Sequence, residues 1–251
     1  MTPVTLVTGA SSGLGEEFAR ICAARGERLV LVARRRERLE ALAAELGNAR
    51  VVVADLSEDC AVRDVLADID AAGERVECLI NNAGFGLVGR FSDLDCAQQR
   101  DMIDLNCGAL TELAHGVLPS MKAQGSGRIL NVASVAGFQP GPGMAVYFAT
   151  KAYVLSFSDA LHEEVRRHGI RVSCLCPGPT STEFGDVAGF GGNKTVESMA
   201  MDARTVAVAG IDALDQGKAV EVPGFTNKLS ANSSRFLPRG AVRRIVNLIK
   251  K

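Results

Sequence analysis

Short apolar runs alternate along the chain with longer segments in which apolar residues recur every three or four positions. Short runs of this kind predict buried strands, and the longer periodic segments predict amphipathic helices. A sheet whose strands are apolar on both faces must be covered on both, so we expect a doubly wound, seven-stranded parallel sheet in one domain over residues 1–251. The predicted strands are 4–8, 28–33, 49–53, 78–81, 128–133, 171–176 and one near 218–222; the predicted helices are 14–25, 35–46, 60–72, 98–121 and 147–167.

Two segments near the carboxyl end depart from this alternation. Residues 183–202 carry four glycines among polar residues, with Phe184, Phe190 and Met199 as isolated apolar positions. We expect a lid over a bound ligand, the alternative being an ordinary surface loop. Residues 236–251 form a basic amphipathic pattern that predicts a helix packed on the core or on a partner subunit, the alternative being contact with an anionic membrane surface.

A glycine-rich turn follows the first predicted strand. The run from Thr8 to Gly15 leads directly into the helix 14–25, and strand, glycine turn and helix in this order predict a dinucleotide site in a Rossmann-type fold. Gly9 permits the tight turn, Gly13 a close approach of backbone to ligand, and Gly15 close packing of helix on strand. The pyrophosphate is expected on the free N–H groups at the helix amino terminus.

The end of the second strand favours NADP(H) over NAD(H). An acidic residue there would bind a free ribose 2′-hydroxyl, whereas an arginine accommodates a 2′-phosphate. This strand ends on Arg34, and the guanidinium fork matches a phosphate, with Ser11 and Ser12 as further hydroxyl donors. The alternative is that the run from Arg34 to Arg36 is a solvated helix start.

Tyr147 and Lys151 are four residues apart on a predicted helix and therefore share a face. A free phenol has a pKa near ~10, and a cation beside it favours the phenolate, so we expect Lys151 to lower the pKa of Tyr147 for acid–base catalysis. Ser134, thirteen residues before the tyrosine, is placed to hold a substrate oxygen against it. The motif residues follow the carboxyl ends of strands, where ligands of doubly wound sheets bind.

In these residues the chain resembles the short-chain dehydrogenase/reductases, in their compact single-domain branch, and most of all members related to steroid and 3-oxoacyl reductases. The resemblance rests on Thr8 to Gly15, Asp55-Leu56, Asn81-Asn82-Ala83-Gly84, Asn106, Ser134, Tyr147, Lys151 and Pro177-Gly178. It implies that Tyr147 exchanges the proton, Lys151 also binds the nicotinamide ribose, and Ser134 holds the carbonyl. Asn106 is implied to anchor a water in the proton relay, although a buried amide that satisfies a bent helix is the alternative.

The resemblance also implies which residues line the cofactor. Asp55 is expected at the adenine amino group, the alternative being a helix cap, and Asn82, Ala83 and Gly84 on the adenosine side. The remaining expected cofactor contacts are Leu14, Leu56, Pro177, Gly178, Thr180 and Thr182. Aromatic and apolar residues near the catalytic ones predict an apolar ketone or secondary alcohol as substrate; these are Phe85, Val135, Phe138, Met144 and Phe184.

Composition excludes other classes of function. Lys plus Arg number 28 against 29 Asp plus Glu without a long basic stripe, which argues against nucleic-acid binding. No signal peptide and no apolar run of ~18 residues is present, and the seven scattered cysteines and three histidines predict no metal site. We expect a cytoplasmic protein with reduced core cysteines. The resemblance implies a homodimer or homotetramer.

These observations predict an NADPH-dependent oxidoreductase that transfers a hydride between nicotinamide and an apolar ketone or secondary alcohol. A non-catalytic NADP(H)-binding sensor on the same fold is the alternative. A nucleotide-sugar epimerase would share the Tyr-x-x-x-Lys spacing, but the Gly-x-x-x-Gly-x-Gly turn and the absence of a sizeable carboxyl-terminal substrate segment oppose it.

Overall fold

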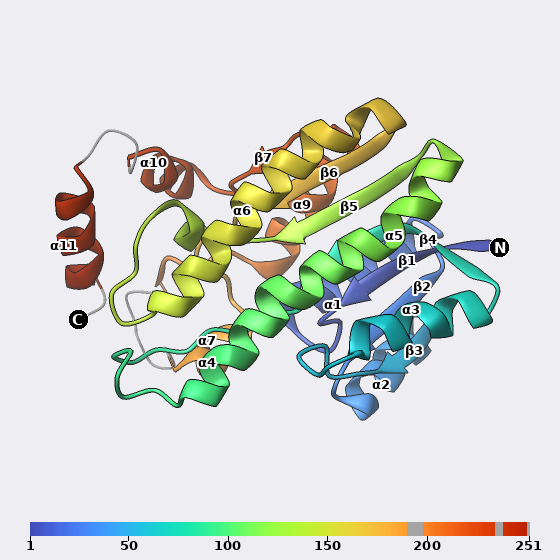
Figure 1. The fold of residues 1–251 in the computed structure, drawn as a ribbon, viewed down its shortest axis with the longest axis horizontal. Helices are drawn as coiled ribbons and strands as arrows, with labels where there is room; N and C mark the ends of the chain where they lie inside the picture. Colours follow the sequence, from blue (N-terminus) through green and yellow to red (C-terminus); the bar gives the residue numbers. More distant parts are fainter. Residues whose placement is uncertain (190–197, 234–237, 250–251) are drawn as a thin grey trace.

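The computed structural model describes residues 1–189, 198–233 and 238–249. Within them seven strands form one sheet in the order β3-β2-β1-β4-β5-β6-β7, and every neighbouring pair is parallel. This confirms the predicted fold class (Figure 1). The strands are β1 (Thr2–Thr8), β2 (Leu29–Ala33), β3 (Ala49–Val53), β4 (Glu74–Asn81), β5 (Gly127–Val132), β6 (Ile170–Leu175) and β7 (Val220–Glu221).

Helices cover both faces of the sheet (Figure 1). One face carries α3 (Ala61–Ala71), α5 (Leu110–Gln124) and α6 (Ala145–Val165). The other carries α1 (Gly13–Ala24), α2 (Arg36–Leu46) and α9 (Ala203–Asp215). Successive side chains of a strand point to opposite faces, so in β2 Val30 and Val32 join the first core while Leu29 and Leu31 join the second. Burial on both faces explains why the strands read as continuous apolar runs.

The segment predicted as one helix over 98–121 is longer and is interrupted. It begins as α4 (Cys96–Ile103), passes through the π-helical segment η1 (Asp104–Ala109) and continues as α5. The carboxylate of Asp95 caps its start by accepting a hydrogen bond from the N–H of Gln98 at 2.9 Å. Single π-helical turns inside an α-helix occur frequently at functional sites, which directs attention to Asn106 within η1.

The chain beyond residue 183 is more helical than the sequence analysis predicts. Besides α9 it contains α7 (Phe184–Ala188), α10 (Phe225–Ser233) and α11 (Arg239–Ile249). The expected lid 183–202 begins with α7, but its residues 190–197 lie outside the described residues. The expected tail helix corresponds to α11, while residues 236–237 and 250–251 again lie outside. Among the parts of the chain that the structure describes, no helix is long and apolar enough to cross a membrane.

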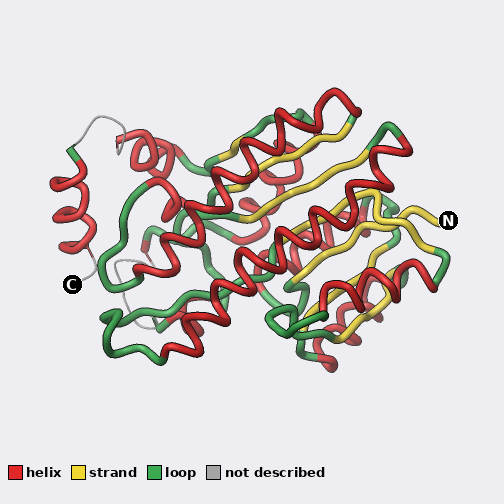
Figure 2. Tube along the Cα trace, viewed as in Figure 1, coloured by secondary structure: helices red, strands yellow, loops and turns green. Residues whose placement is uncertain are grey.

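The seven strands lie side by side (Figure 2), and because neighbouring pairs are all parallel, their carboxyl ends lie along one edge of the sheet. The strand arrows in Figure 1 point toward the side where α7, α10 and α11 lie. The strand order reverses direction between β1 and β4, and a crevice at such a reversal is where open α/β sheets bind their ligands.

Four cysteines are buried as expected, but Cys60 and Cys96 are exposed and Cys107 is half-buried, so the prediction that all are core residues is wrong.

Candidate active site

The glycine turn between β1 and α1 is fixed by the loop that follows β4. Thr8 is buried, and its Oγ1 accepts hydrogen bonds from the N–H groups of Asn82 and Ala83, each at 3.0 Å. The Asn82 amide in turn donates to the carbonyl of Thr8 at 2.9 Å and of Gly9 at 3.3 Å. The Asn82 side chain, expected at the adenosine, therefore holds the turn itself in shape.

Close packing within the turn requires the glycines at the predicted positions. Gly9 and Gly13 have φ values of 66° and 56°, in the left-handed region that favours glycine. A Cβ on Gly15 would lie 2.1 Å from the Gly9 carbonyl oxygen, and one on Gly13 would meet the Thr182 side chain at 2.9 Å. Ser12 stands at the helix start without a side-chain capping bond, so its hydroxyl remains available to a ligand on the helix amino terminus.

Two arginines, rather than the expected one, approach this turn from the end of β2. Arg34 is 68% exposed in its side chain, and its Nη1 lies 3.4 Å from Asp55 Oδ2. Arg35 donates from Nε to Ser11 Oγ at 3.1 Å and from Nη2 to the Ser11 carbonyl at 3.0 Å. Sequence reasoning missed Arg35 because the run of arginines gives no sign of which side chain turns inward.

Carboxylates balance these cations. Glu183 accepts a hydrogen bond from Arg35 at 2.9 Å and one from Arg38, and both guanidinium groups hold its pKa below the ordinary value. Burial raises the pKa of Asp55, but hydrogen bonds from Ser57 and the charge of Arg34 outweigh it, so the net pKa lies below the ordinary value. A phosphate arriving at Arg35 would meet a guanidinium that is already oriented by Ser11 and Glu183.

Tyr147 and Lys151 lie one turn apart on α6 and are both buried. The Lys151 Nζ is 5.8 Å from the centroid of the Tyr147 ring and donates to the Val132 carbonyl at 2.9 Å. Burial raises the pKa of Tyr147 to about 12, against an opposing hydrogen bond with Ser134, and burial lowers the pKa of Lys151 to about 8. The pKa of Tyr147 therefore lies above its ordinary value of 10.0, not below it as expected, because burial outweighs the hydrogen bond with Ser134.

Ser134 follows β5 and stands at the start of the short 3₁₀ helix η2 (Val135–Phe138). Its Oγ accepts from the N–H of Ala136 at 3.1 Å and donates to the Pro177 carbonyl at 3.3 Å. These bonds hold the hydroxyl at the end of β5, where it also forms a hydrogen bond with the Tyr147 side chain. The structure thus brings Ser134, Tyr147 and Lys151 together at the carboxyl ends of β5 and β6.

Asn106 lies in the π-helical segment and is buried. Its amide donates to the Phe85 carbonyl at 2.9 Å and to Thr150 Oγ1 at 3.1 Å, and its Oδ1 accepts from the Phe85 N–H at 3.1 Å. A Cβ on Gly84 would lie 2.8 Å from Asn106 Oδ1 and 3.6 Å from the Lys151 ammonium. Asn106 therefore ties the loop after β4 to α6, and its side chain has little capacity left for a water.

The expected substrate residues divide into two groups. Phe85, Met144 and Phe184 share an apolar cluster with Tyr147, and the rings of Phe184 and Tyr147 have centroids 5.5 Å apart. Phe138 packs in a different cluster, and the Val135 N–H donates to the Pro177 carbonyl at 2.9 Å. The first cluster also contains residues that sequence reasoning did not select, namely Leu87, Met102, Ala136, Val146, Phe148, Val242 and Val246.

The remaining expected cofactor residues lie along the same edge. A Cβ on Gly178 would meet the Asn227 side chain at 2.3 Å, so the loop after β6 passes tightly against α10. Thr180 pairs with Met201 in an isolated bridge, and Leu14 packs partly buried at the start of α1. Leu56 is buried in the core beneath α3, which places its side chain away from the cleft.

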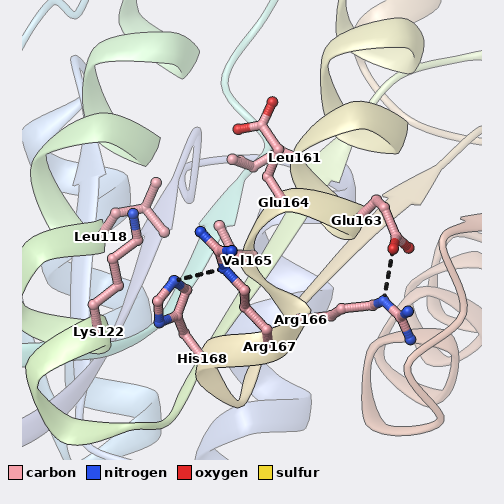
Figure 3. Close-up of a pocket in the computed structure, with 9 residues that line it drawn as sticks. All are labelled: Leu118, Lys122, Leu161, Glu163, Glu164, Val165, Arg166, Arg167 and His168. Atoms are coloured by element: carbon pink, nitrogen blue, oxygen red, sulfur yellow. Dashed lines mark hydrogen bonds and ion pairs between the residues drawn. The ribbon is translucent and has the colours of Figure 1, made fainter.

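A separate surface pocket lies at the other end of α5 and α6. Figure 3 shows charged side chains of both signs around it, with Arg166 bonded to Glu163 at 2.9 Å and Arg167 to His168 at 3.3 Å. It contains none of the motif residues. The described residues hold no group of three or more His, Cys, Asp or Glu side chains suited to a metal ion. The chemistry therefore concentrates at the carboxyl ends of the strands.

Comparisons with known proteins show which family the chain is similar to. The family model described as short chain dehydrogenase matches residues 3–210. Sulfoacetaldehyde reductase 2 of Chromohalobacter salexigens is 40% identical over 189 residues, which cover 73% of this chain and 75% of that protein. A short-chain dehydrogenase from Sphingobium yanoikuyae in complex with NADPH has a TM-score of 0.84 and 35% identity, covering 93% of both chains. The bulky-bulky ketone specific alcohol dehydrogenase from Comamonas testosteroni has a TM-score of 0.78 and 30% identity, covering 94% of this chain and 92% of that one.

Proposed function

The chain belongs to the short-chain dehydrogenase/reductase family of oxidoreductases that act on alcohol and carbonyl groups, and we propose that it reduces an apolar ketone with NADPH. The observation that carries this proposal is a buried phenol at the carboxyl edge of the sheet. Tyr147 there contacts Ser134 on one side and an apolar cluster on the other. The same geometry in reverse oxidises the corresponding secondary alcohol.

Tyr147 is the proposed proton donor. When bound, NADPH supplies a hydride to the carbonyl carbon, and the carbonyl oxygen takes up a proton as negative charge develops on it. Tyr147, with a pKa of about 12, carries its proton throughout the neutral range and can give it to that oxygen. The Ser134 hydroxyl turns from the Pro177 carbonyl to donate a second hydrogen bond there, and the Lys151 ammonium stabilises the tyrosinate that remains.

The residues around the glycine turn fit a phosphorylated dinucleotide. The free N–H groups at the start of α1 and the uncapped Ser12 hydroxyl suit the pyrophosphate. Arg34 is exposed and Arg35 is held against Ser11, so two guanidinium groups flank the position of a ribose 2′-phosphate. We therefore propose NADP(H) as the preferred cofactor. The neighbour from Sphingobium yanoikuyae, a complex with NADPH, supports this choice.

An apolar substrate fits the cluster around Tyr147 better than a small anionic one. A sulfonate such as sulfoacetaldehyde needs cationic or hydrogen-bonding partners next to the reacting carbonyl. The side chains that share the cluster with the phenol are apolar, among them Phe85, Met144 and Phe184. This favours the ketone named for the Comamonas testosteroni neighbour over the substrate named for the Chromohalobacter salexigens relative.

The proposal also covers the oligomeric state of the protein, its cellular location and a lid over the substrate. We place residues 1–251 in one domain of a cytoplasmic homodimer or homotetramer, with segment 183–202 acting as a lid. On α6 the half-buried ring of Phe157 stacks on the exposed ring of Tyr153, with the ring centroids 5.8 Å apart. These two rings form an aromatic surface suited to a subunit contact. At the start of the lid, Phe184 already lies against Tyr147.

The test is a titration of the protein with NADPH and with NADH, in which nicotinamide fluorescence reports binding. Turnover of apolar ketones is measured afterwards. Arg34→Ala and Arg35→Ala should each weaken NADPH binding at least about tenfold and leave NADH binding unchanged, because a charge-assisted bond to phosphate is lost. Arg36→Ala is the matched control, since this exposed neighbour pairs only with Glu40 among the recorded ion pairs of the described residues.

The same experiment distinguishes the NADPH-dependent reductase from the non-catalytic NADP(H)-binding sensor. Equal affinity for both cofactors, or an equal loss in all three variants, would refute the phosphate assignment. Tight NADPH binding without reduction of any ketone or aldehyde would favour the non-catalytic sensor. Binding together with ketone reduction would establish the enzyme.

A further inference from the structure

The carboxyl-terminal helix α11 contributes to the apolar cluster that surrounds the candidate proton donor. Val242 and Val246 are each 6% exposed and share this cluster with Tyr147 and Met144. The two valines are four residues apart and therefore lie on one face of α11. On the remaining surface of the helix, Arg243 and Arg244 are exposed. Helix α11 is thus oriented with an apolar face toward the active site and cations toward water.

The cluster closes tightly around the phenol ring. A Cβ on Gly86 would lie 3.0 Å from Tyr147 Cδ2, 3.1 Å from Phe184 Cζ and 3.3 Å from Met144 Cε. Three chain segments thus converge on Tyr147: the loop after β4, the start of α6 and the start of α7. Helix α11 adds Val242 and Val246 to the same apolar cluster, although it is distant in sequence and lies beyond residue 210, where the family match ends. Figure 1 places it on the side toward which the strands point.

We infer that Val242 and Val246 form the outer wall of the substrate pocket, and that α11 thereby selects ring-sized apolar ketones over small ones. This inference rests on the proposed function, because it assigns the carbonyl substrate to the Tyr147 cluster. Acetone, the smallest ketone, is held near Ser134 and Tyr147 alone. A ring ketone extends into the cluster and gains affinity by burying its carbons against the two valines.

The test compares the double variant Val242→Ala/Val246→Ala with wild type on two ketones, 1-decalone and acetone. Removing the wall should lower kcat/KM for decalone about tenfold, as expected for lost methyl contacts, and leave acetone within about twofold. Arg243→Ala/Arg244→Ala, on the exposed surface of the same helix, is the matched control and should change neither. NADPH affinity and melting temperature show whether each variant is folded.

A second variant covers the case in which the double variant does not fold. Val246→Phe adds volume at the wall and should abolish decalone reduction while acetone turnover persists. An equal loss for both ketones, or no loss for decalone in either variant, would overturn the inference.

Failure of the proposed function gives a different result. Calorimetric titration of decalone into the complex with NADP⁺ requires no turnover. If wild type binds decalone but reduces nothing, the proposed reaction fails while the wall is still tested by the affinity of the valine variants. If wild type does not bind decalone, the wall itself is overturned.

Discussion

Carbonyl reduction should slow as the pH rises through about 8, because Lys151 loses its proton there. Burial lowers the pKa of this lysine from 10.5 to about 8. The pKa of Tyr147 is about 12, so the phenol keeps its proton over the same range and contributes no change. The lysine charge is what stabilises the tyrosinate formed in the reaction, and a neutral amine at the same position cannot replace it.

The magnitude follows from the titration of one group. With a pKa of about 8, Lys151 is about 90% protonated at pH 7 and about 10% protonated at pH 9. We therefore expect kcat/KM for the ketone to fall about tenfold between these values and a further tenfold per pH unit above them. A lysine at its ordinary pKa of 10.5 would give no change below pH 9.

The assay is the initial rate of NADPH oxidation at limiting ketone and saturating NADPH between pH 6 and 10. Lys151→Arg retains a charged side chain throughout this range, so any activity that it keeps should lack the alkaline limb. The reasoning is refuted if wild-type kcat/KM stays level to pH 10, or if Lys151→Arg shows the same limb near pH 8.

Two further predictions concern stability. Thr8→Val leaves the N–H groups of Asn82 and Ala83 without their buried acceptor and should lower the free energy of unfolding by about 2–6 kcal/mol, at about 1–3 kcal/mol for each group. A loss under about 1 kcal/mol in urea unfolding would contradict this. Lys151→Met should abolish activity but raise stability at pH 7 by up to about 3 kcal/mol, because it removes a buried charge whose pKa is depressed. Since the unfolded lysine binds its proton up to about pH 10.5, this gain should be complete below about pH 8 and vanish above pH 10.5; a gain that is independent of pH would exclude this origin.

The sheet and its motif loops could be predicted from sequence because each depends on local pattern. Strands that are buried on both faces, such as β2, are continuous apolar runs, and such runs mark the strand positions in the sequence. The glycine turn is likewise local, since Gly9 and Gly13 adopt backbone angles that other residues avoid. The gathering of Asp55, Asn82 and Ser134 followed from the rule that parallel strands end on one edge of the sheet.

What sequence reasoning missed depends on contacts between distant segments. Helix α9 is capped by Asp202, which accepts from the Thr205 N–H at 2.8 Å, but its place beside α1 is a tertiary feature. The place of Arg35 against the glycine turn follows from its hydrogen bonds to Ser11. The raised pKa of Tyr147 reflects burial, which helix periodicity alone does not reveal.

The central claim, that Tyr147 gives the proton to a carbonyl oxygen, is tested most directly by Tyr147→Phe in single-turnover reduction of 1-decalone with bound NADPH. We expect unchanged NADPH affinity, because the phenol lies in the apolar cluster rather than at the glycine turn. We expect the reduction rate to fall by at least about a hundredfold, the typical contribution of a positioned acid. A variant that binds NADPH and reduces the ketone at near the wild-type rate would contradict the claim.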